Sequence, residues 1–322
     1  MSQEQGNELA EWIDPHVHVL PPRRLRGLIR WVKSFNPSFP VPETITAEDI
    51  LSELRGAGIS FFFNLVFPLW PEETEDLNRF NCEFCSKVPG ALGFGSLHTE
   101  NGDKEGITRR CLREYGLAGM KLHPFAQRFP AFDLAMDPLF RVLHQEGRPL
   151  LVHTGFDRFY GERTEDEGLL RVLSRFPDMP VVLVHSLFPR FGFARRLLER
   201  FSQVWLDLTN SVSCMRIFLE WKERGEPLPP MASSLEGEEV EGNLQDWWAL
   251  FREHPDRLLY GTDYPAGFGD HADLHRDLLY LELPDGTVRS ILHDNVLAFL
   301  EASGLKLPSG GGEIPPNRVP GQ

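Results

Sequence analysis

The chain has 322 residues, of which 41% are hydrophobic and 25% are charged. These fractions are close to those of ordinary globular proteins, and they exclude a wholly disordered chain. The 47 acidic residues outnumber the 33 basic residues, which gives a formal net charge of -14. A surface with this charge repels phosphate backbones and anionic lipids, so the composition argues against binding to nucleic acids or membrane surfaces.

No segment of the sequence is expected to cross a membrane or to direct secretion. The most apolar stretch, residues 59–70, contains Asn64 and Pro68 and is shorter than the ~20 residues of a spanning helix. The N-terminus is polar and acidic, unlike a signal peptide. The four cysteines are too few for a disulfide framework, and the one Cys-x-x-Cys pair, Cys82 and Cys85, has no second pair. We therefore expect a cytoplasmic protein.

Short apolar runs alternate with amphipathic runs along the whole chain. Residues 46–58 begin with Thr46, a favourable N-cap, and end in glycine, which predicts a helix. Residues 191–201 and 273–283 also carry apolar side chains at helical spacing. Eight apolar runs are predicted to be strands: 12–19, 59–67, 91–97, 118–122, 150–153, 181–185, 204–208 and 258–261. Strands that alternate with helices in this way predict a single-domain (β/α)8 barrel over residues 1–302.

Three segments lie outside this alternation. Residues 20–44 are rich in proline and arginine and are expected to form a long loop after the first strand. Residues 225–242 contain five glutamates and no lysine or arginine, which predicts a mobile acidic insertion. Residues 303–322 are expected to form a flexible tail.

The first predicted strand ends in the sequence Asp14-Pro15-His16-Val17-His18. In a (β/α)8 barrel, functional side chains gather at the C-terminal ends of the strands. His16 and His18 are two residues apart, so they are expected to point to the same side of a strand. Two imidazoles in this arrangement are suited to chelate a divalent metal. The pair alone is equally compatible with two unrelated polar positions.

Other predicted strands also end in ionisable residues. These are Lys121 and His123 after the fourth run, His153 after the fifth, His185 after the sixth and Asp263 after the eighth. Each follows mostly apolar residues, so its side chain is expected to be buried and to need a partner. One such histidine alone would be more typical of a core position. The convergence of several histidines and an aspartate on one barrel mouth favours a metal site.

Five motifs carry a resemblance to a known family: DPHVH (14–18), GMKLHP (119–124), LVHTG (151–155), VLVHS (182–186) and YGTDYP (260–265). They resemble the amidohydrolase superfamily, specifically the amidohydrolase-related (amidohydrolase 2) branch that includes aminocarboxymuconate semialdehyde decarboxylase. The resemblance covers about residues 11–302, and HDNVLAFL (293–300) is similar to the closing helix of that family. It implies a (β/α)8 barrel with a divalent metal at its mouth.

The resemblance also implies a role for each of these strand-end residues. His16 and His18 would ligate the ion, with zinc as the expected metal, and His153 would be a further ligand. Asp263 would ligate the ion or take a proton from its water. His185 would bind a second metal or act as an acid and base.

Lys121 leaves the number of metal ions open. In two-metal members of the superfamily, a lysine at the end of the fourth strand is carboxylated and bridges the ions, and KLHP resembles that site. In one-metal members the bridge is absent, and Lys121 would be an ammonium group that binds a substrate carboxylate. The sequence favours one ion and leaves two open.

Three further residues are candidates for substrate binding. His123 shares a strand face with Lys121 and is expected to reach the barrel mouth. Arg128 could hold a substrate carboxylate through two hydrogen bonds, and a solvated arginine is the alternative. His98 ends the third apolar run and could contact substrate, or it could form hydrogen bonds within a loop.

These features predict a metal-dependent hydrolase in which a metal-bound water attacks an amide, lactone or ester bond of a small molecule. The alternative is a metal-dependent, non-oxidative decarboxylase or hydratase of a small unsaturated or aromatic acid. A nuclease is disfavoured because superfamily nucleases carry glutamate where Lys121 stands. A non-catalytic barrel is disfavoured by the intact ligand set. The expected partner is a small-molecule substrate, and a homodimer is left open.

Overall fold

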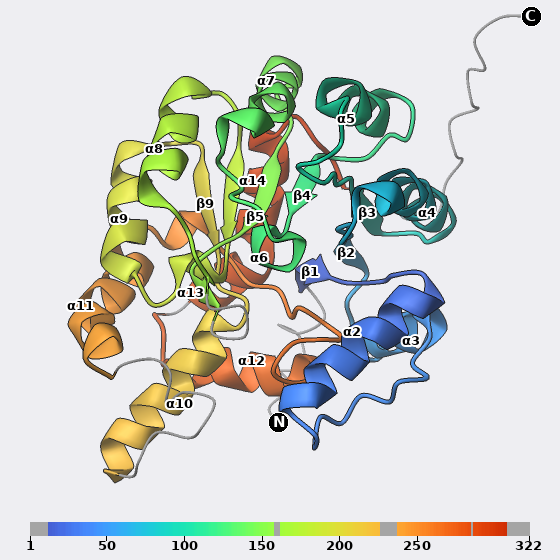
Figure 1. Ribbon diagram of the computed structural model, residues 1–322. Helices are drawn as coiled ribbons and strands as arrows, with labels where there is room; N and C mark the ends of the chain where they lie inside the picture. The colour runs from blue at the N-terminus through green and yellow to red at the C-terminus, as the bar shows by residue number, and fades with distance from the viewer. Residues whose placement is uncertain (1–11, 158–161, 226–236, 285, 308–322) are drawn as a thin grey trace, which may run out of the picture.

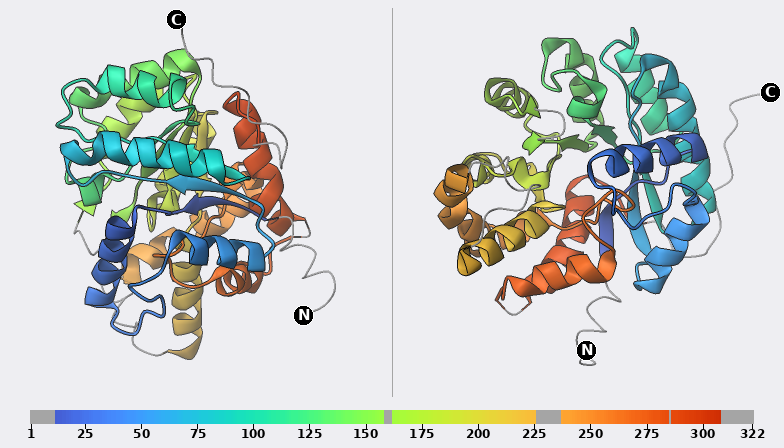
Figure 2. Two further views of the ribbon diagram at one scale, coloured as in Figure 1. Left: turned by 90° about the vertical axis from the view of Figure 1, so that its right-hand side faces the viewer. Right: turned by 60° about the horizontal axis from the view of Figure 1, so that its bottom comes forward.

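A computed structural model describes residues 12–157, 162–225, 237–284 and 286–307. Strands stand at its centre and helices surround them (Figures 1 and 2). The central strands are all parallel and number eight in the described part of the chain: β1 (Ile13–Val17), β2 (Phe61–Leu65), β3 (Ala91–Phe94), β4 (Met120–Leu122), β5 (Leu150–His153), β8 (Val181–Val184), β9 (Val204–Asp207) and β10 (Leu258–Leu259). Every predicted strand is present, and the predicted barrel architecture is confirmed.

The strands form two hydrogen-bonded groups, in the orders β1-β2-β3 and β4-β5-β8-β9-β10. Single parallel bridges continue the barrel between the groups, from Gly95 to Met120 and from Val17 to Tyr264. At the second junction, the backbone N–H of His18 donates to the carbonyl of Tyr264 at 2.8 Å. This junction places the end of β1 beside the segment that follows β10.

Helices cover the outside of the strands, and the short hairpin β6 (Phe156–Asp157) and β7 (Glu162–Arg163) follows β5. The α-helices are α2 (Pro22–Phe35), α3 (Ala47–Gly56), α4 (Thr74–Lys87), α5 (Lys104–Arg113), α6 (Pro124–Gln127), α7 (Asp137–Glu146), α8 (Asp166–Arg175), α9 (Phe191–Arg200), α10 (Ser211–Arg224), α11 (Gly237–Glu253), α12 (His271–Tyr280), α13 (Thr287–Arg289) and α14 (Asn295–Ala302). Short 3-10 turns are η1 (Pro71–Glu73), η2 (Leu134–Met136), η3 (His185–Leu187) and η4 (Pro255–Arg257), and η5 (Ser290–Asp294) is a π-helical turn.

The prediction of a long loop over residues 20–44 was wrong, because α2 occupies residues 22–35. Proline in the first helical turn favours this start. Leu25, Ile29 and Val32 recur at helical spacing and are buried on one face. Residues 226–236 of the predicted acidic insertion lie outside the described residues, and α11 begins at Gly237. Residues 308–322 of the predicted tail also lie outside the described residues.

The barrel interior is apolar at one end. Inward-facing residues such as Ile13, Phe63 and Trp205 pack in one cluster with side chains of α14. The ring of Phe299 on α14 lies 6.2 Å from that of Phe63 and 5.7 Å from that of Trp205, measured between centroids. This packing closes one end of the barrel, so the polar strand ends at the other end form its mouth.

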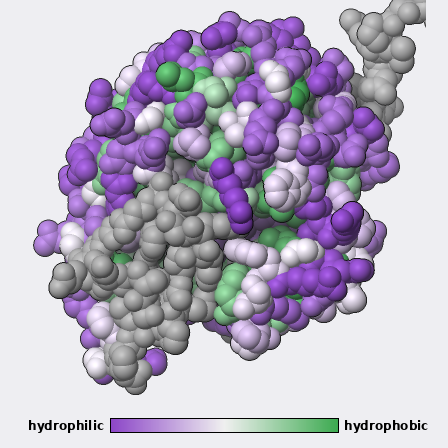
Figure 3. Space-filling view, viewed as in Figure 1, coloured by the Kyte–Doolittle hydropathy of each residue, from purple (hydrophilic) through white to green (hydrophobic). Residues whose placement is uncertain are grey.

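The visible surface of the protein is largely polar. The face seen in Figure 3 is mainly hydrophilic, with hydrophobic residues in small scattered groups. Within the described residues, no helix combines the length and the apolar character that a membrane crossing requires. The four cysteines are free thiols, and Cys82 and Cys85 lie on α4.

A buried ion pair joins β1 to α12. The Oδ2 atom of Asp14 lies 3.1 Å from Nε2 of His271, and neither side chain is exposed. Nδ1 of His271 lies 3.6 Å from a carboxylate oxygen of Glu53. Burial alone would lower the pKa of His271, but the interactions with Asp14 and Glu53 outweigh it and raise the pKa to about 9.

We predict that His271→Gln lowers the free energy of unfolding by about 2–4 kcal/mol near pH 6, because it leaves the Asp14 carboxylate buried without its cation. The folded-state pKa of about 9 lies above the ordinary value of 6.5. The contribution of the charged histidine is therefore complete below pH 6.5 and is lost as the pH rises through about 9. Urea unfolding at pH 6 and pH 9.5 measures this difference.

The control is His293→Gln, because the ion pair that His293 makes within the described residues is with the exposed Asp294. Its effect should stay within about 0.5 kcal/mol. A His271→Gln deficit of equal size at both pH values would contradict the proposed charge on His271.

Candidate metal centre

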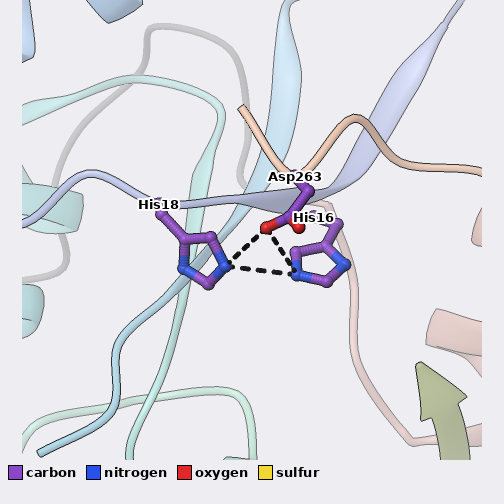
Figure 4. A group of neighbouring side chains, drawn as sticks. All are labelled: His16, His18 and Asp263. Carbon is purple, nitrogen blue, oxygen red and sulfur yellow. Dashed lines mark hydrogen bonds and ion pairs between the residues drawn. The ribbon is translucent and has the colours of Figure 1, made fainter. Parts of the chain in front are cut away.

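A bulge in β1 turns two histidines into the barrel mouth. The pairing of β1 with β2 shifts register between Asp14 and Val17. Ile13, before the shift, packs in the interior cluster, whereas Val17, after it, packs in the outer core. Strict alternation from Ile13 would place Val17 inside, so the bulge reverses the faces, as bulges near functional sites commonly do. His16 and His18 consequently point inward together (Figure 4).

Three ligand atoms converge at this point. Nε2 of His16 and Nε2 of His18 are 3.2 Å apart. The Oδ1 atom of Asp263, from the segment after β10, lies 3.0 Å from Nε2 of His18 and 3.5 Å from Nε2 of His16. Both histidines are buried. The arrangement therefore brings together two residues at the C-terminal end of β1 and one residue about 245 positions later in the sequence.

The hydrogen-bond partners of Nδ1 in His16 and His18 determine whether Nε2 of each ring carries a hydrogen or a lone pair. Nδ1 of His16 lies 2.8 Å from Oδ2 of Asp207, and Nδ1 of His18 lies 2.6 Å from the carbonyl oxygen of Leu65. Both partners accept hydrogen bonds, so each Nδ1 carries a hydrogen and each neutral ring has its lone pair on Nε2. Burial and the nearby Lys121 lower the pKa of His16 to about 4, so this ring is neutral at pH 7.

The donor set therefore fits a divalent cation. Two imidazole lone pairs and one carboxylate oxygen face one another at 3.0–3.5 Å. These three acceptor atoms repel one another unless a cation or a proton lies between them. Imidazole ligands whose second nitrogen is bonded to a carboxylate or a backbone carbonyl are typical of protein metal sites.

Hydrogen bonds fix both the backbone and the side chain of Asp263. Its backbone has a positive φ of 59°, and its N–H donates to the carbonyl of His16 at 2.8 Å. Its Oδ2 accepts a hydrogen bond from Nδ2 of Asn210 at 2.9 Å, which leaves Oδ1 facing the imidazoles. Burial raises the pKa of Asp263, but His16 and His18 outweigh burial and hold the pKa well below its usual range. Asp263 is therefore a carboxylate at neutral pH.

Asp207, at the end of β9, was not among the predicted site residues. Its Oδ2 accepts the hydrogen bond from His16, and its Oδ1 accepts one from the backbone N–H of Thr209 at 2.9 Å. Burial raises the pKa of Asp207, but the interaction with His16 outweighs burial and keeps the carboxyl ionised. A polar residue at the end of an apolar strand was the signal that identified His153, and the same signal marks Asp207.

His123, His153 and His185 form a row of imidazoles beside the three converging residues. The rings of His123 and His153 stack with centroids 3.9 Å apart. Nδ1 of His153 lies 3.1 Å from Nε2 of His185, whose Nδ1 lies 2.8 Å from the carbonyl oxygen of Thr209. Burial lowers the pKa of His123 and of His153 well below the ordinary value. His153 thus contacts His185 and, among the described residues, is not in the close group of His16, His18 and Asp263.

Lys121 is a fully buried lysine on β4. Among the residues that the structure describes, its Nζ has no hydrogen-bond partner. It lies close enough to His16, His123 and His153 to lower the pKa of all three. Burial lowers the pKa of Lys121 itself to about 8. An unmatched buried amine is compatible with both predicted roles, anion binding and carboxylation.

His98 and Arg128, which were predicted to contact substrate, lie outside the group formed by His16, His18 and Asp263. Nε2 of His98 lies 3.1 Å from the carbonyl oxygen of Gln127, and its Nδ1 accepts from the N–H of Glu100 at 3.2 Å. Both ring nitrogens of His98 therefore serve the local loop structure. Arg128 lies at the C-terminal cap of α6 with a positive φ of 56°, and it is exposed.

Several solved structures share this fold. A 2,6-dihydroxybenzoate decarboxylase in complex with 2,6-dihydroxybenzoate superposes with a TM-score of 0.64 at 13% identity, covering 91% of this chain and 100% of that one. A 5-carboxyvanillate decarboxylase from Novosphingobium aromaticivorans with bound manganese gives 0.60 at 13% identity, covering 93% and 98%. A Pseudomonas putida protein provisionally named 2-pyrone-4,6-dicarboxylic acid hydrolase gives 0.59 at 18% identity, covering 92% and 98%.

These identities are low, so the structural similarity shows the fold alone. A comparison with curated proteins found no match. The model of one family, described as Amidohydrolase, matches residues 13–301, which include every strand of the barrel and all three converging residues. The chain therefore belongs to this amidohydrolase family.

Proposed function

We propose that this protein is a metal-dependent hydrolase that acts on an amide, ester or lactone bond of a small molecule. The observation that carries the proposal is the convergence of His16 Nε2, His18 Nε2 and Asp263 Oδ1, all acceptors with their other atoms held in place. A divalent ion bound there supplies a Lewis acid that polarises a carbonyl and acidifies water. We propose zinc, because two imidazoles and one carboxylate oxygen form a typical catalytic zinc site.

We assign proton transfer to His185. The carbonyl of Thr209 accepts from its Nδ1, so its Nε2 is the atom that can take up a proton and return it to a leaving group. Asp263 is less suited to this role, because Asn210 holds its Oδ2 and its Oδ1 faces the histidines. Nδ1 of His153 lies 3.1 Å from Nε2 of His185, so a proton taken up at Nε2 would be shared with Nδ1 of His153.

A second candidate function is decarboxylation of a small carboxylic acid. The buried, unmatched amine of Lys121 favours it, because an ammonium group there would bind the carboxylate of such a substrate. Two of the structurally similar proteins are decarboxylases of aromatic acids. The two functions differ in their products: a hydrolase incorporates oxygen from H₂¹⁸O, whereas a decarboxylase releases carbon dioxide without this incorporation.

We predict that protein purified with bicarbonate and without chelators contains about one zinc or manganese ion per chain, measured by elemental analysis. The double variant His16→Gln, His18→Gln should lose the ion. The control variant His293→Gln, which changes a histidine outside the site, should retain it. Failure of the wild type to hold or take up either metal would contradict the proposed function.

A content of two ions would change the proposed role of Lys121. It would favour a carboxylated Lys121 and a second ion held by His153 and His185. It would also favour hydrolysis over decarboxylation.

We predict that Lys121→Met raises the free energy of unfolding at pH 7 by about 1–3 kcal/mol, because it removes a buried group without a partner. The folded-state pKa of about 8 lies below the ordinary value of 10.5. The penalty of the charged lysine is therefore complete below pH 8 and disappears as the pH rises toward 10.5. Urea unfolding of wild type and variant at pH 7 and pH 10 measures the gain.

The matched control is Lys87→Met at the exposed end of α4, which should change the stability by less than about 0.5 kcal/mol. A Lys121→Met variant that is less stable than the wild type at pH 7 would show that the ammonium group has a stabilising partner within the fold.

A further inference from the structure

One short segment at the end of β9, Asp207–Asn210, contacts three residues of the site. Asp207 accepts a hydrogen bond from His16, and the carbonyl of Thr209 accepts one from His185. Nδ2 of Asn210 donates to Oδ2 of Asp263 at 2.9 Å. The first two contacts fix the hydrogens of imidazole rings. The third acts on a carboxylate, whose two oxygens are both able to bind a cation.

The local structure shows that the Asn210 side chain does not stabilise its own helix. Asn210 stands at the N-cap of α10, where asparagine commonly accepts a hydrogen bond from a backbone N–H of the first turn. Here the side chain makes no capping hydrogen bond. The backbone has φ 62° and ψ -29°, a left-handed conformation that asparagine adopts more readily than most residues. The side chain is directed at Asp263 instead.

The orientation of the Asn210 amide follows from its partner. Only the NH₂ group can donate to a carboxylate, so Oδ1 of Asn210 must point away from Oδ2 of Asp263. This Oδ1 is buried and has no hydrogen-bond partner among the residues that the structure describes. A buried acceptor left in this way costs about 1–3 kcal/mol. The contact with Asp263 therefore exists at the expense of local stability, as is common where a side chain serves a functional site.

We propose that Asn210 is a positioning residue that restricts Asp263 to one ligating oxygen and thereby makes the site selective for zinc over manganese. The inference rests on the metal centre proposed above. Zinc favours four ligands in a tetrahedral arrangement, whereas manganese favours six ligands rich in oxygen. A carboxylate free to turn can present both oxygens to one ion, which serves the larger coordination number. With Oδ2 held by Asn210, Asp263 presents Oδ1 alone.

The test is the affinity of the full-length, metal-free chain for zinc and for manganese, each measured by competition with a chromophoric chelator. Asn210→Gly removes the amide, and glycine accepts the positive φ without steric cost. We expect zinc affinity to fall about 10–100-fold, in the range typical of lost contacts to metal ligands. Manganese affinity should fall much less, so that the preference for zinc shrinks by at least about fivefold.

Two further variants separate this role from a general loss of stability. Asn210→Ala deletes the same amide but strains the left-handed backbone, so it should share the metal defect while melting at a lower temperature than Asn210→Gly. Asn295→Ala removes a buried amide that donates to the carbonyls of Pro255 and Leu258 at the opposite end of the barrel. It should leave both metal affinities unchanged.

The outcomes distinguish the inference from the function on which it rests. A wild-type chain that binds neither metal overturns the proposed metal centre itself. A wild-type chain that binds metal, with unchanged affinities in Asn210→Gly, overturns the role of Asn210 alone. An equal loss for zinc and manganese also overturns it, because a merely structural residue would weaken both ions by the same factor.

Discussion

The hydrogen bond between Asp207 and His16 determines the chemistry of the barrel mouth. It places the hydrogen of the ring on Nδ1 and so leaves the lone pair of Nε2 directed at His18 and Asp263. With the opposite tautomer, an N–H would stand where a cation is needed, and the three converging atoms would satisfy one another. The same logic applies to His18 and the Leu65 carbonyl. A carboxylate and a carbonyl outside the group of three converging atoms thus set which atoms of the two imidazoles face its centre.

This arrangement requires a rigid frame, because the three ligand atoms come from two distant parts of the chain. The junction between the end of β1 and the segment after β10 supplies it. The N–H of Asp263 donates to His16 and the N–H of His18 donates to Tyr264, so the two segments are joined on both sides of the site. Beneath them, Asp14 accepts from the backbone of Thr262 and from His271. Hydrogen bonds made away from water in this way hold the two segments in one geometry.

The parts of the fold that follow from local sequence were predictable. The strands could be predicted because each is an apolar run between turns, and helix α3 because Thr46 caps its N-terminus and glycine stands at its end. The strand-end residues were found by the same reasoning. The bulge in β1 and the partners of Asp207 and Asn210 were not, because they depend on how strands far apart in sequence align. The segment 20–44 was misassigned because its prolines and arginines obscured the helical spacing of Leu25, Ile29 and Val32.

The packing of α14 against the strands has a consequence for the entry of reactants and the release of products. Phe299 and its neighbours fill the end of the barrel opposite the proposed metal centre, so within the described residues the mouth is the end from which the site can be reached. A reactant and the product derived from it must use the same opening in turn. Departure of the product therefore has to precede entry of the next reactant, and a product that leaves slowly acts as a competitive inhibitor. Turnover at a site reached from one end is sensitive to the loops around the barrel mouth, since they govern both arrival and departure.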